Sequence, residues 1–203
     1  MHNPEHILCR EMSLLAFNRR VLAQVQDSRV PLLERLRFLC IVSSNLDEFF
    51  EVRMAWLKQQ LRLSPHLPLA NGELPQLVIH NVIAEIRNII TTQYQLFNQD
   101  ILPALQTEGV RFYRRREWTA AQADWVEEYF LRELKPILTP IGLDSSHPFP
   151  RLMNKSLNFA VELDGKDAFG RESGMAIVQA PRILPRVVQL PPELCDGQYG
   201  FVF

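Results

Sequence analysis

The longest regular pattern in this sequence is a series of apolar residues at helical spacing between Pro75 and Leu105. A helix over this range would be about 45 Å long, at roughly 1.5 Å per residue. Such a helix must pack its apolar face against other helices, so the pattern predicts a helical bundle. Pro103 is expected to kink or fray its last turn. The apolar face comprises Val78, Ile79, Val82, Ile83, Ile86, Ile90, Tyr94, Phe97, Ile101 and Leu105.

The residues before this helix predict three more helices. Ser13 is expected to cap a first helix that ends near Gln26, with Leu14, Phe17, Val21 and Val25 on its buried stripe. Pro31 suits the first turn of a second helix, because proline costs little where the backbone N–H has no helical partner. The second helix has a broad apolar face, formed by Leu32, Leu33, Leu36, Leu39, Cys40 and Phe38. A third helix is predicted from Leu46 to Leu63, before Pro65 and Pro68.

The pattern changes after Gly109. Residues 110–113 alternate like a strand, and Thr119 with Gln122 predicts a capping box at the start of a helix that ends before Pro136. A Pro-rich connection without helical or strand period follows, from Pro136 to Pro150. Strands are predicted over residues 157–163, 175–180 and 183–190. The strand-like run from Tyr199 to Phe203 has no polar tail, and we expect an uncovered edge there, as in a chain cut inside a domain.

The predicted fold class is therefore α+β. Residues 1–107 are expected to form an all-α helical bundle domain, and residues 108–203 an incomplete α+β head domain that is truncated at its C-terminal side. The formal net charge of −1 is also balanced locally, with 10 basic and 10 acidic residues up to Thr107 and 12 basic and 13 acidic residues after it. This balance argues against nucleic acid as a partner.

Three scattered cysteines, Cys9, Cys40 and Cys195, do not form a disulfide framework and are expected to be buried, inert thiols in a reducing cytoplasm. No apolar run reaches the roughly 18 residues that would span a membrane, although peripheral membrane association is compatible with the sequence. The first residues lack the basic and apolar regions of a signal peptide. We expect a cytoplasmic protein.

The densest polar segment is Ser43–Glu48, which lies between an apolar helix end and Phe49-Phe50. One interpretation is a helix–helix joint, with Ser44 or Asn45 as the N-cap and an acidic residue completing a capping box. The other is a nucleotide site. A helix start offers free backbone N–H groups, and an asparagine amide pairs with an adenine edge. The aromatic residues Phe38, Phe49 and Phe50 would then supply an apolar wall, and the residue pattern leaves both interpretations open.

Several segments resemble the bacterial polyphosphate kinases that work through a phosphohistidine. They are residues 11–22 (EMSLLAFNRRVL), 30–39 (VPLLERLRFL), 41–50 (IVSSNLDEFF), 138–144 (LTPIGLD) and 147–158 (HPFPRLMNKSLN). The resemblance extends in family order from about residue 11 to the end of the chain. This sequence departs from the family pattern at Leu15, where many relatives have tryptophan, and at Glu51, where an apolar residue is commoner. Leu15 should affect packing, and Glu51 the local surface.

This resemblance implies that Asn45 contacts ATP and that the helical domain precedes a head domain associated with dimer formation. It also implies a reversible transfer of the terminal phosphate of ATP to inorganic polyphosphate, with ATP or ADP as the other partner, and assembly into a homo-oligomer. The phosphorylated histidine and the ligands of the Mg²⁺ cofactor belong to later domains of the family. We therefore assign no catalytic residue and no metal ligand to this chain.

The histidines and arginines are expected to serve structure or solvation. Pro4 makes a helical metal pair of His2 and His6 unfavourable, and His147 between prolines suits a structural hydrogen bond better than a nucleophile. His66 and His80 have no partner at ligand spacing. Charged runs are usually solvated, but arginine also pairs with phosphate oxygens. Guidance of polyphosphate is thus the alternative for the two runs, which comprise Arg19, Arg20, Arg114, Arg115 and Arg116.

A second function class fits the pattern equally well. Broad apolar helix faces followed by an α+β region are also typical of a non-catalytic helical module that mediates assembly. Nucleotide binding distinguishes the two hypotheses, because only the first predicts that adenine affects the residues from Ser43 to Glu48.

Overall fold

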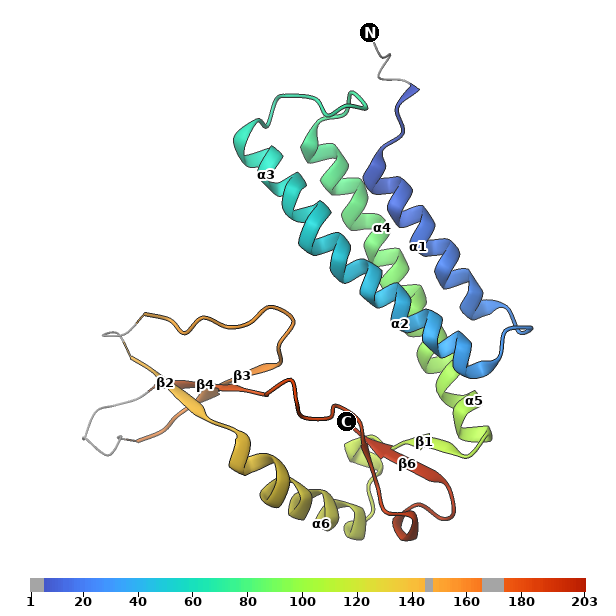
Figure 1. The fold of residues 1–203 in the computed structure, drawn as a ribbon, viewed down its shortest axis with the longest axis vertical. Coiled ribbons are helices and arrows are strands. Elements are labelled where there is room, and N and C mark those ends of the chain that lie inside the picture. Colours follow the sequence, from blue (N-terminus) through green and yellow to red (C-terminus); the bar gives the residue numbers. More distant parts are fainter. Residues whose placement is uncertain (1–5, 145–147, 166–173) are drawn as a thin grey trace. The chain divides into compact units, whose positions relative to one another are not determined.

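The computed structural model describes residues 6–144, 148–165 and 174–203. The chain divides into two compact units, Met1–Glu108 and Gly109–Phe203. The first, here called the helical unit, consists of helices, and the second, the mixed unit, combines short strands with helical segments (Figure 1). The α+β fold class predicted from the sequence is confirmed.

The helical unit is built from three long helical rods (Figure 1). The first is α1 (Arg10–Gln26), the second runs from α2 (Leu32–Glu48) through a π-helical segment (Phe49–Met54) into α3 (Ala55–Leu63), and the third runs from α4 (Pro75–Leu96) through a π-helical segment (Phe97–Ile101) into α5 (Leu102–Thr107). Helix α1 packs against α2 and α4, and α3 packs against α4. The bundle expected from the apolar pattern is present.

The predicted joint between a second and a third helix at Ser43–Glu48 is wrong. Phe49 has helical backbone angles (φ −58°, ψ −45°), and its N–H donates to the carbonyl oxygens of Asn45 and Leu46. Two polar side chains of this segment, Ser43 and Asn45, bond to side chains on other helices instead of capping a new one. Ser43 Oγ accepts a hydrogen bond from Gln93 Nε2 of α4 at 2.7 Å. Asn45 therefore lies inside a continuous helix, and its neighbourhood offers no helix start.

The predicted start of α1 and the predicted positions of Leu14 and Phe17 on its buried stripe are also wrong, whereas Val25 is buried as predicted. The helix begins at Arg10 after Cys9, and the Ser13 hydroxyl donates back to the Cys9 carbonyl at 2.9 Å. Leu14 and Phe17 are exposed. The buried stripe instead consists of Glu11, Leu15, Asn18, Leu22 and Val25. Two of these buried residues are polar. A search for apolar periodicity alone therefore selects a helix face that is shifted by about one residue from the buried face.

The long helix predicted after Pro75 is confirmed. It widens into a π-helical turn about one turn before Pro103. The proline ring would crowd the carbonyl four residues back, and that position lies within the π-helical segment Phe97–Ile101. Gln93 is buried and Tyr94 is exposed, the reverse of the expectation for this turn. The buried residues of the rod are Pro75, Val78, Val82, Ile86, Ile89, Gln93, Leu96, Ile101 and Leu105.

The described residues of the mixed unit form two three-stranded sheets. In one, β6 (Tyr199–Val202) lies between β1 (Val110–Phe112), which is parallel to it, and β5 (Val188–Gln189), which is antiparallel. In the other, β4 (Met175–Gln179) lies between β2 (Pro140–Leu143) and β3 (Asn158–Glu162), and both are antiparallel to it. The uncovered edge expected at Tyr199–Phe203 is wrong, because β6 has a neighbour on each side.

Two other expectations for the mixed unit need correction. The connection from Pro136 to Pro150 contains β2, and the strand expected over residues 183–190 is reduced to β5. Prolines shorten the regular pairing in both segments, which hides the strand period in the sequence. The capping box at Thr119 is confirmed at the start of α6 (Ala120–Tyr129), which continues through shorter helical turns to Ile137.

A buried cluster of the mixed unit packs closely against Gly200. Tyr113, Leu190, Cys195 and Val202 form a buried cluster. A Cβ atom at Gly200 would overlap Cys195 Sγ and lie 2.9 Å from Tyr113 Cε2, so only glycine fits this position without movement of its neighbours. Burial raises the pKa of the Cys195 thiol. The expectation of buried thiols fails for Cys40, which is exposed on α2.

Candidate functional site

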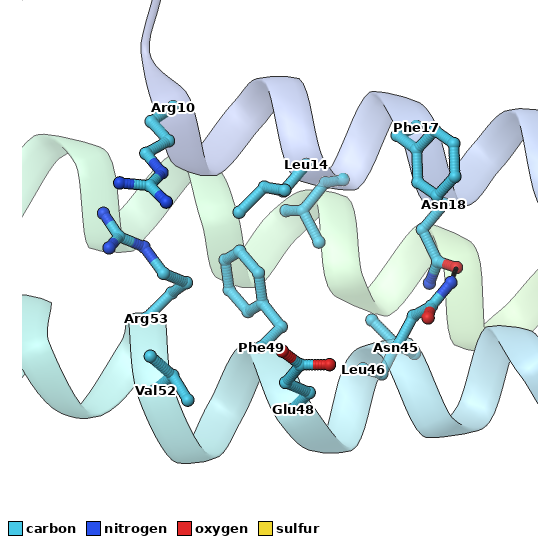
Figure 2. Close-up of a pocket in the computed structure, with 11 residues that line it drawn as sticks. Arg10, Leu14, Phe17, Asn18, Asn45, Leu46, Glu48, Phe49, Val52 and Arg53 are labelled. Carbon is cyan, nitrogen blue, oxygen red and sulfur yellow. Dashed lines mark hydrogen bonds between the residues drawn. The ribbon is translucent and has the colours of Figure 1, made fainter.

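A pocket of about 280 Å³ lies between α1 and the α2–α3 rod of the helical unit (Figure 2). This volume is close to the lower end of the roughly 300–1,000 Å³ typical of small-molecule sites, so the pocket can enclose part of a nucleotide. Its lining is mostly apolar with a few polar groups. The lining residues are Arg10, Leu14, Leu15, Phe17, Asn18, Asn45, Leu46, Glu48, Phe49, Val52 and Arg53.

Two side-chain amides meet at one end of the pocket. Asn45 Nδ2 on α2 donates to Asn18 Oδ1 on α1 at 3.0 Å, and the two amide groups point toward each other in Figure 2. Asn18 is 2% exposed, and its Nδ2 donates to the Val42 carbonyl at 3.2 Å. Asn45 is half-buried, and its Oδ1 and second N–H take no part in the bond to Asn18. Asn45 thus lines the pocket and keeps one acceptor and one N–H donor outside the bond to Asn18.

A buried ion pair lies toward the opposite end. Arg53 Nε donates to Glu11 Oε1 at 3.1 Å, and Arg53 Nη2 bonds to the same oxygen. The side chains are 19% and 5% exposed, respectively. Glu11 also lies in the first turn of α1, where a negative charge suits the helix dipole. This pair joins α1 to the π-helical segment after α2 and holds together the two walls of the pocket.

The Arg53 guanidinium also stacks over the Trp56 ring, 5.2 Å from its centroid. Figure 2 shows the side chain of Arg10 at the same end of the pocket as Arg53. The pocket therefore has an amide end and a cationic end, and Leu14, Phe49 and the Glu48 carboxylate lie between them.

The structure brings only part of the predicted nucleotide site together. Asn45 and Phe49 line the pocket, whereas Phe38 and Phe50 do not. Phe50 packs edge-on against Phe49, with ring centroids 6.5 Å apart. The free backbone N–H groups expected beside Asn45 belong to a continuous helix instead.

Sequence reasoning missed Asn18 and Phe17. Phe17 lines the pocket with its ring half-exposed, although it was expected in the core. Asn18 could have been found from spacing, because it falls between Leu15 and Leu22 on a stripe of helical period. A polar residue within such a stripe indicates a buried partner. Leu15 itself is 1% exposed and lies in the core of the helical unit.

The arginine runs are mostly exposed, as expected for solvated charges. Arg19 pairs with Glu85 of α4 at 3.2 Å, and Arg20 lies over the Phe17 ring at 5.6 Å. In the mixed unit, Arg116 pairs with Glu117 at 3.9 Å. The described histidines His6, His66 and His80 are exposed. His2 and His147 lie outside the described residues.

Two features of the described residues bear on the class of site. They contain no group of three His, Cys, Asp or Glu side chains that could hold a metal ion. None of their helices is both long enough and apolar enough to cross a bilayer.

The chain matches two family models that follow each other along the sequence. Residues 7–113 match the polyphosphate kinase N-terminal domain, and residues 121–203 match the polyphosphate kinase middle domain. Together these matches include both units and the whole lining of the pocket.

Individual relatives carry the same name. A polyphosphate kinase of Neisseria meningitidis is 69% identical over 203 residues, which is the whole of this chain and 30% of the relative. One of Burkholderia multivorans is 55% identical over 196 residues, 97% of this chain and 28% of the relative. The crystal structure of polyphosphate kinase from Porphyromonas gingivalis matches with a TM-score of 0.77 and 28% identity, over 97% of this chain and 28% of that chain.

The chain thus spans about 30% of the length of these curated relatives. The first family model alone covers more than half of its residues. By these matches the chain belongs to the polyphosphate kinase family.

Proposed function

We propose that this chain contributes part of the nucleotide site of a polyphosphate kinase. The reaction moves the terminal phosphate of ATP reversibly onto inorganic polyphosphate, through a histidine that lies outside residues 1–203. The pocket of the helical unit supports this proposal. It offers an apolar enclosure with one adjacent donor and acceptor on Asn45, which is the arrangement that an adenine edge requires.

In this proposal Asn45 binds the base, which is not the reacting part of ATP. The binding energy of a remote group helps to orient the reacting phosphate, because the bound nucleotide loses its freedom before the chemical step. The cationic end of the pocket lies away from Asn45 (Figure 2). Magnesium, when bound by the complete enzyme, would neutralise charge on the transferred phosphoryl group.

Replacement of Asn45 by alanine in the complete enzyme tests the contact with the base. We expect KM for ATP to rise about tenfold, equivalent to about 1.4 kcal/mol. Asn98→Ala is the matched control. Asn98 is an exposed helical asparagine of the same unit that bonds to its own helix at the Tyr94 carbonyl, so KM should stay at the wild-type value. An unchanged KM and kcat in Asn45→Ala would remove this residue from the site.

We further propose that residues 1–203 do not transfer phosphate by themselves. When the isolated chain is incubated with ATP labelled in the terminal phosphate and Mg²⁺, the protein should remain unlabelled. Stable radiolabel on this chain would show that it contains a phosphoryl acceptor of its own.

Assembly into a homo-oligomer and guidance of polyphosphate by arginines are further proposals for the complete enzyme. Arginine guidance is tested by measuring KM for polyphosphate in Arg115→Ala and in Arg19→Ala. The wild-type Arg19 side chain already pairs with Glu85. If neither change alters KM for polyphosphate at fixed ionic strength, arginine guidance by these residues fails.

A further inference from the structure

A backbone carbonyl determines the orientation of both amides at the pocket. The carbonyl oxygen of Val42 can only accept, so the Asn18 amide atom that faces it at 3.2 Å has to be nitrogen. The other amide atom of Asn18 is therefore oxygen. The Asn45 atom that faces this oxygen at 3.0 Å must in turn be nitrogen. The assignment of both amides thus follows from the hydrogen-bond network.

This chain of bonds gives Asn45 a fixed direction at the pocket. One N–H of Asn45 is held by Asn18, so the nitrogen end of this amide faces Asn18 and Oδ1 lies at the other end. Rotation of the Asn45 amide by half a turn would place its oxygen against Asn18 Oδ1. Two acceptors would then face each other beside a buried side chain, and such an unpaired buried group costs about 1–3 kcal/mol.

The order of donor and acceptor distinguishes adenine from guanine. On its pairing edge adenine presents a 6-amino donor next to a ring-nitrogen acceptor, whereas guanine presents a 6-oxo acceptor next to a ring N–H donor. An amide that rotates freely satisfies either base in the same position. An amide with a fixed direction satisfies only one of them.

We propose that Asn18 is a positioning residue that makes the nucleotide site selective for adenine over guanine, by fixing the direction of the Asn45 amide. This inference rests on the proposed contact between Asn45 and the base. Asn18 is itself nearly inaccessible, at 2% exposure, and it acts through Asn45.

The test measures kcat/KM for ATP and for GTP in the complete enzyme, with the ratio of the two as the readout. Asn18→Leu removes the partner of Asn45 at similar volume, and the ratio should fall about tenfold. Asn18→Asp should keep the ratio within about twofold of wild type. A neutral carboxyl group can still donate to the Val42 carbonyl and accept from Asn45, and an ionised one still accepts from Asn45.

Gln93→Leu is the matched control for a purely structural effect. Gln93 is also a buried amide that donates to a carbonyl of α2, that of Leu39 at 3.0 Å, but it lies outside the pocket lining. This variant should lose a similar amount of stability and keep the wild-type ratio. Asn18→Ala, which leaves space for water, replaces Asn18→Leu if the leucine variant does not fold.

The outcomes separate this inference from the proposed function. If Asn45→Ala raises KM for ATP while Asn18→Leu or Asn18→Ala keeps the wild-type ratio, the inference fails and the contact of Asn45 stands. The inference also fails if Gln93→Leu lowers the ratio as much, if Asn18→Asp lowers it as much, or if the wild-type enzyme does not prefer ATP. If Asn45→Ala changes neither KM nor the ratio, the proposed contact itself is wrong.

Discussion

The two units of this chain use their buried polar side chains differently. In the helical unit, Glu11, Asn18 and Gln93 each bond to a group on another helix, between 24 and 54 residues away. In the mixed unit, Gln122 completes the cap of its own helix with one side-chain atom and donates to the Leu194 carbonyl at 2.7 Å with the other. The first arrangement joins helices and shapes a pocket, and the second mainly starts a helix.

This difference predicts which substitutions weaken each unit. The three tryptophans allow the units to be followed separately, because Trp56 lies in the helical unit and Trp118 and Trp125 lie in the mixed unit. Fluorescence during denaturant unfolding, with phenylalanine replacing the tryptophans of the other unit, reports each transition.

The largest effect is expected for the buried ion pair. Arg53→Ala leaves the Glu11 carboxylate buried without its partner. The free energy of unfolding of the helical unit, followed by Trp56 fluorescence, should therefore fall by about 3 kcal/mol. Arg132→Ala is the control, because its pairs with Glu128 and Glu133 are exposed and such pairs contribute at most about 1 kcal/mol. Equal losses for the two variants would contradict the distinction between buried and exposed pairs.

A smaller effect is expected where the mixed unit is closely packed. Gly200→Ala forces a methyl group against Cys195 Sγ and Tyr113, and overpacking of this kind typically costs about 1–3 kcal/mol. The Trp118 and Trp125 transition should shift while the Trp56 transition stays in place. Cys195→Ala removes the Sγ atom, so the double variant should be more stable than the sum of the single effects. Strict additivity would show that this contact does not matter.

The cap of α6 should contribute about 1 kcal/mol. Thr119→Ala removes the acceptor of the Gln122 N–H at 3.2 Å, and the mixed-unit transition should shift accordingly. Thr107→Ala is the control, because the Thr107 hydroxyl is exposed and only bonds back to the Pro103 carbonyl. If Thr119→Ala has no effect, the buried Gln122 is held by Leu194 rather than by its own helix.

The smallest effect concerns the turn between α1 and α2. Hydrogen bonds from Arg29 lower the pKa of Asp27 from 3.8 to about 2. A lowered pKa in the folded state favours folding above the unfolded value near 4, and this contribution is lost as the pH falls toward 2. The Arg29 side chain is 89% exposed, so the contribution of this pair is small. In Arg29→Ala, an NMR titration should move the Asp27 pKa back toward 3.8, and a value still near 2 would rule out Arg29 as the cause.

The elements predicted correctly from the sequence are those held by local contacts. The α6 cap was predictable because Thr119 and Gln122 are three residues apart and their bonds are local. The long α4 rod was predictable from its apolar period. Both depend on neighbours in the sequence, and sequence patterns record such neighbours directly.

The site was only partly predictable, because its bonds connect distant segments. Asn45 was identified from the family resemblance, but the expected helix start around it was wrong. The side chains that stabilise α2 through this region lie on α1 and α4, at Asn18 and Gln93. No local rule assigns such partners, and a polar cluster with remote partners has the same sequence pattern as a cap.

The central claim is that the base of ATP binds beside Asn45 in the pocket between α1 and α2. Photolabelling of the complete enzyme with 8-azidoadenosine triphosphate tests this claim most directly, because the reactive group is attached to the base. The claim predicts that label appears within residues 10–53 and is competed away by ATP. Label found only outside these residues, under conditions where ATP competes, would contradict it.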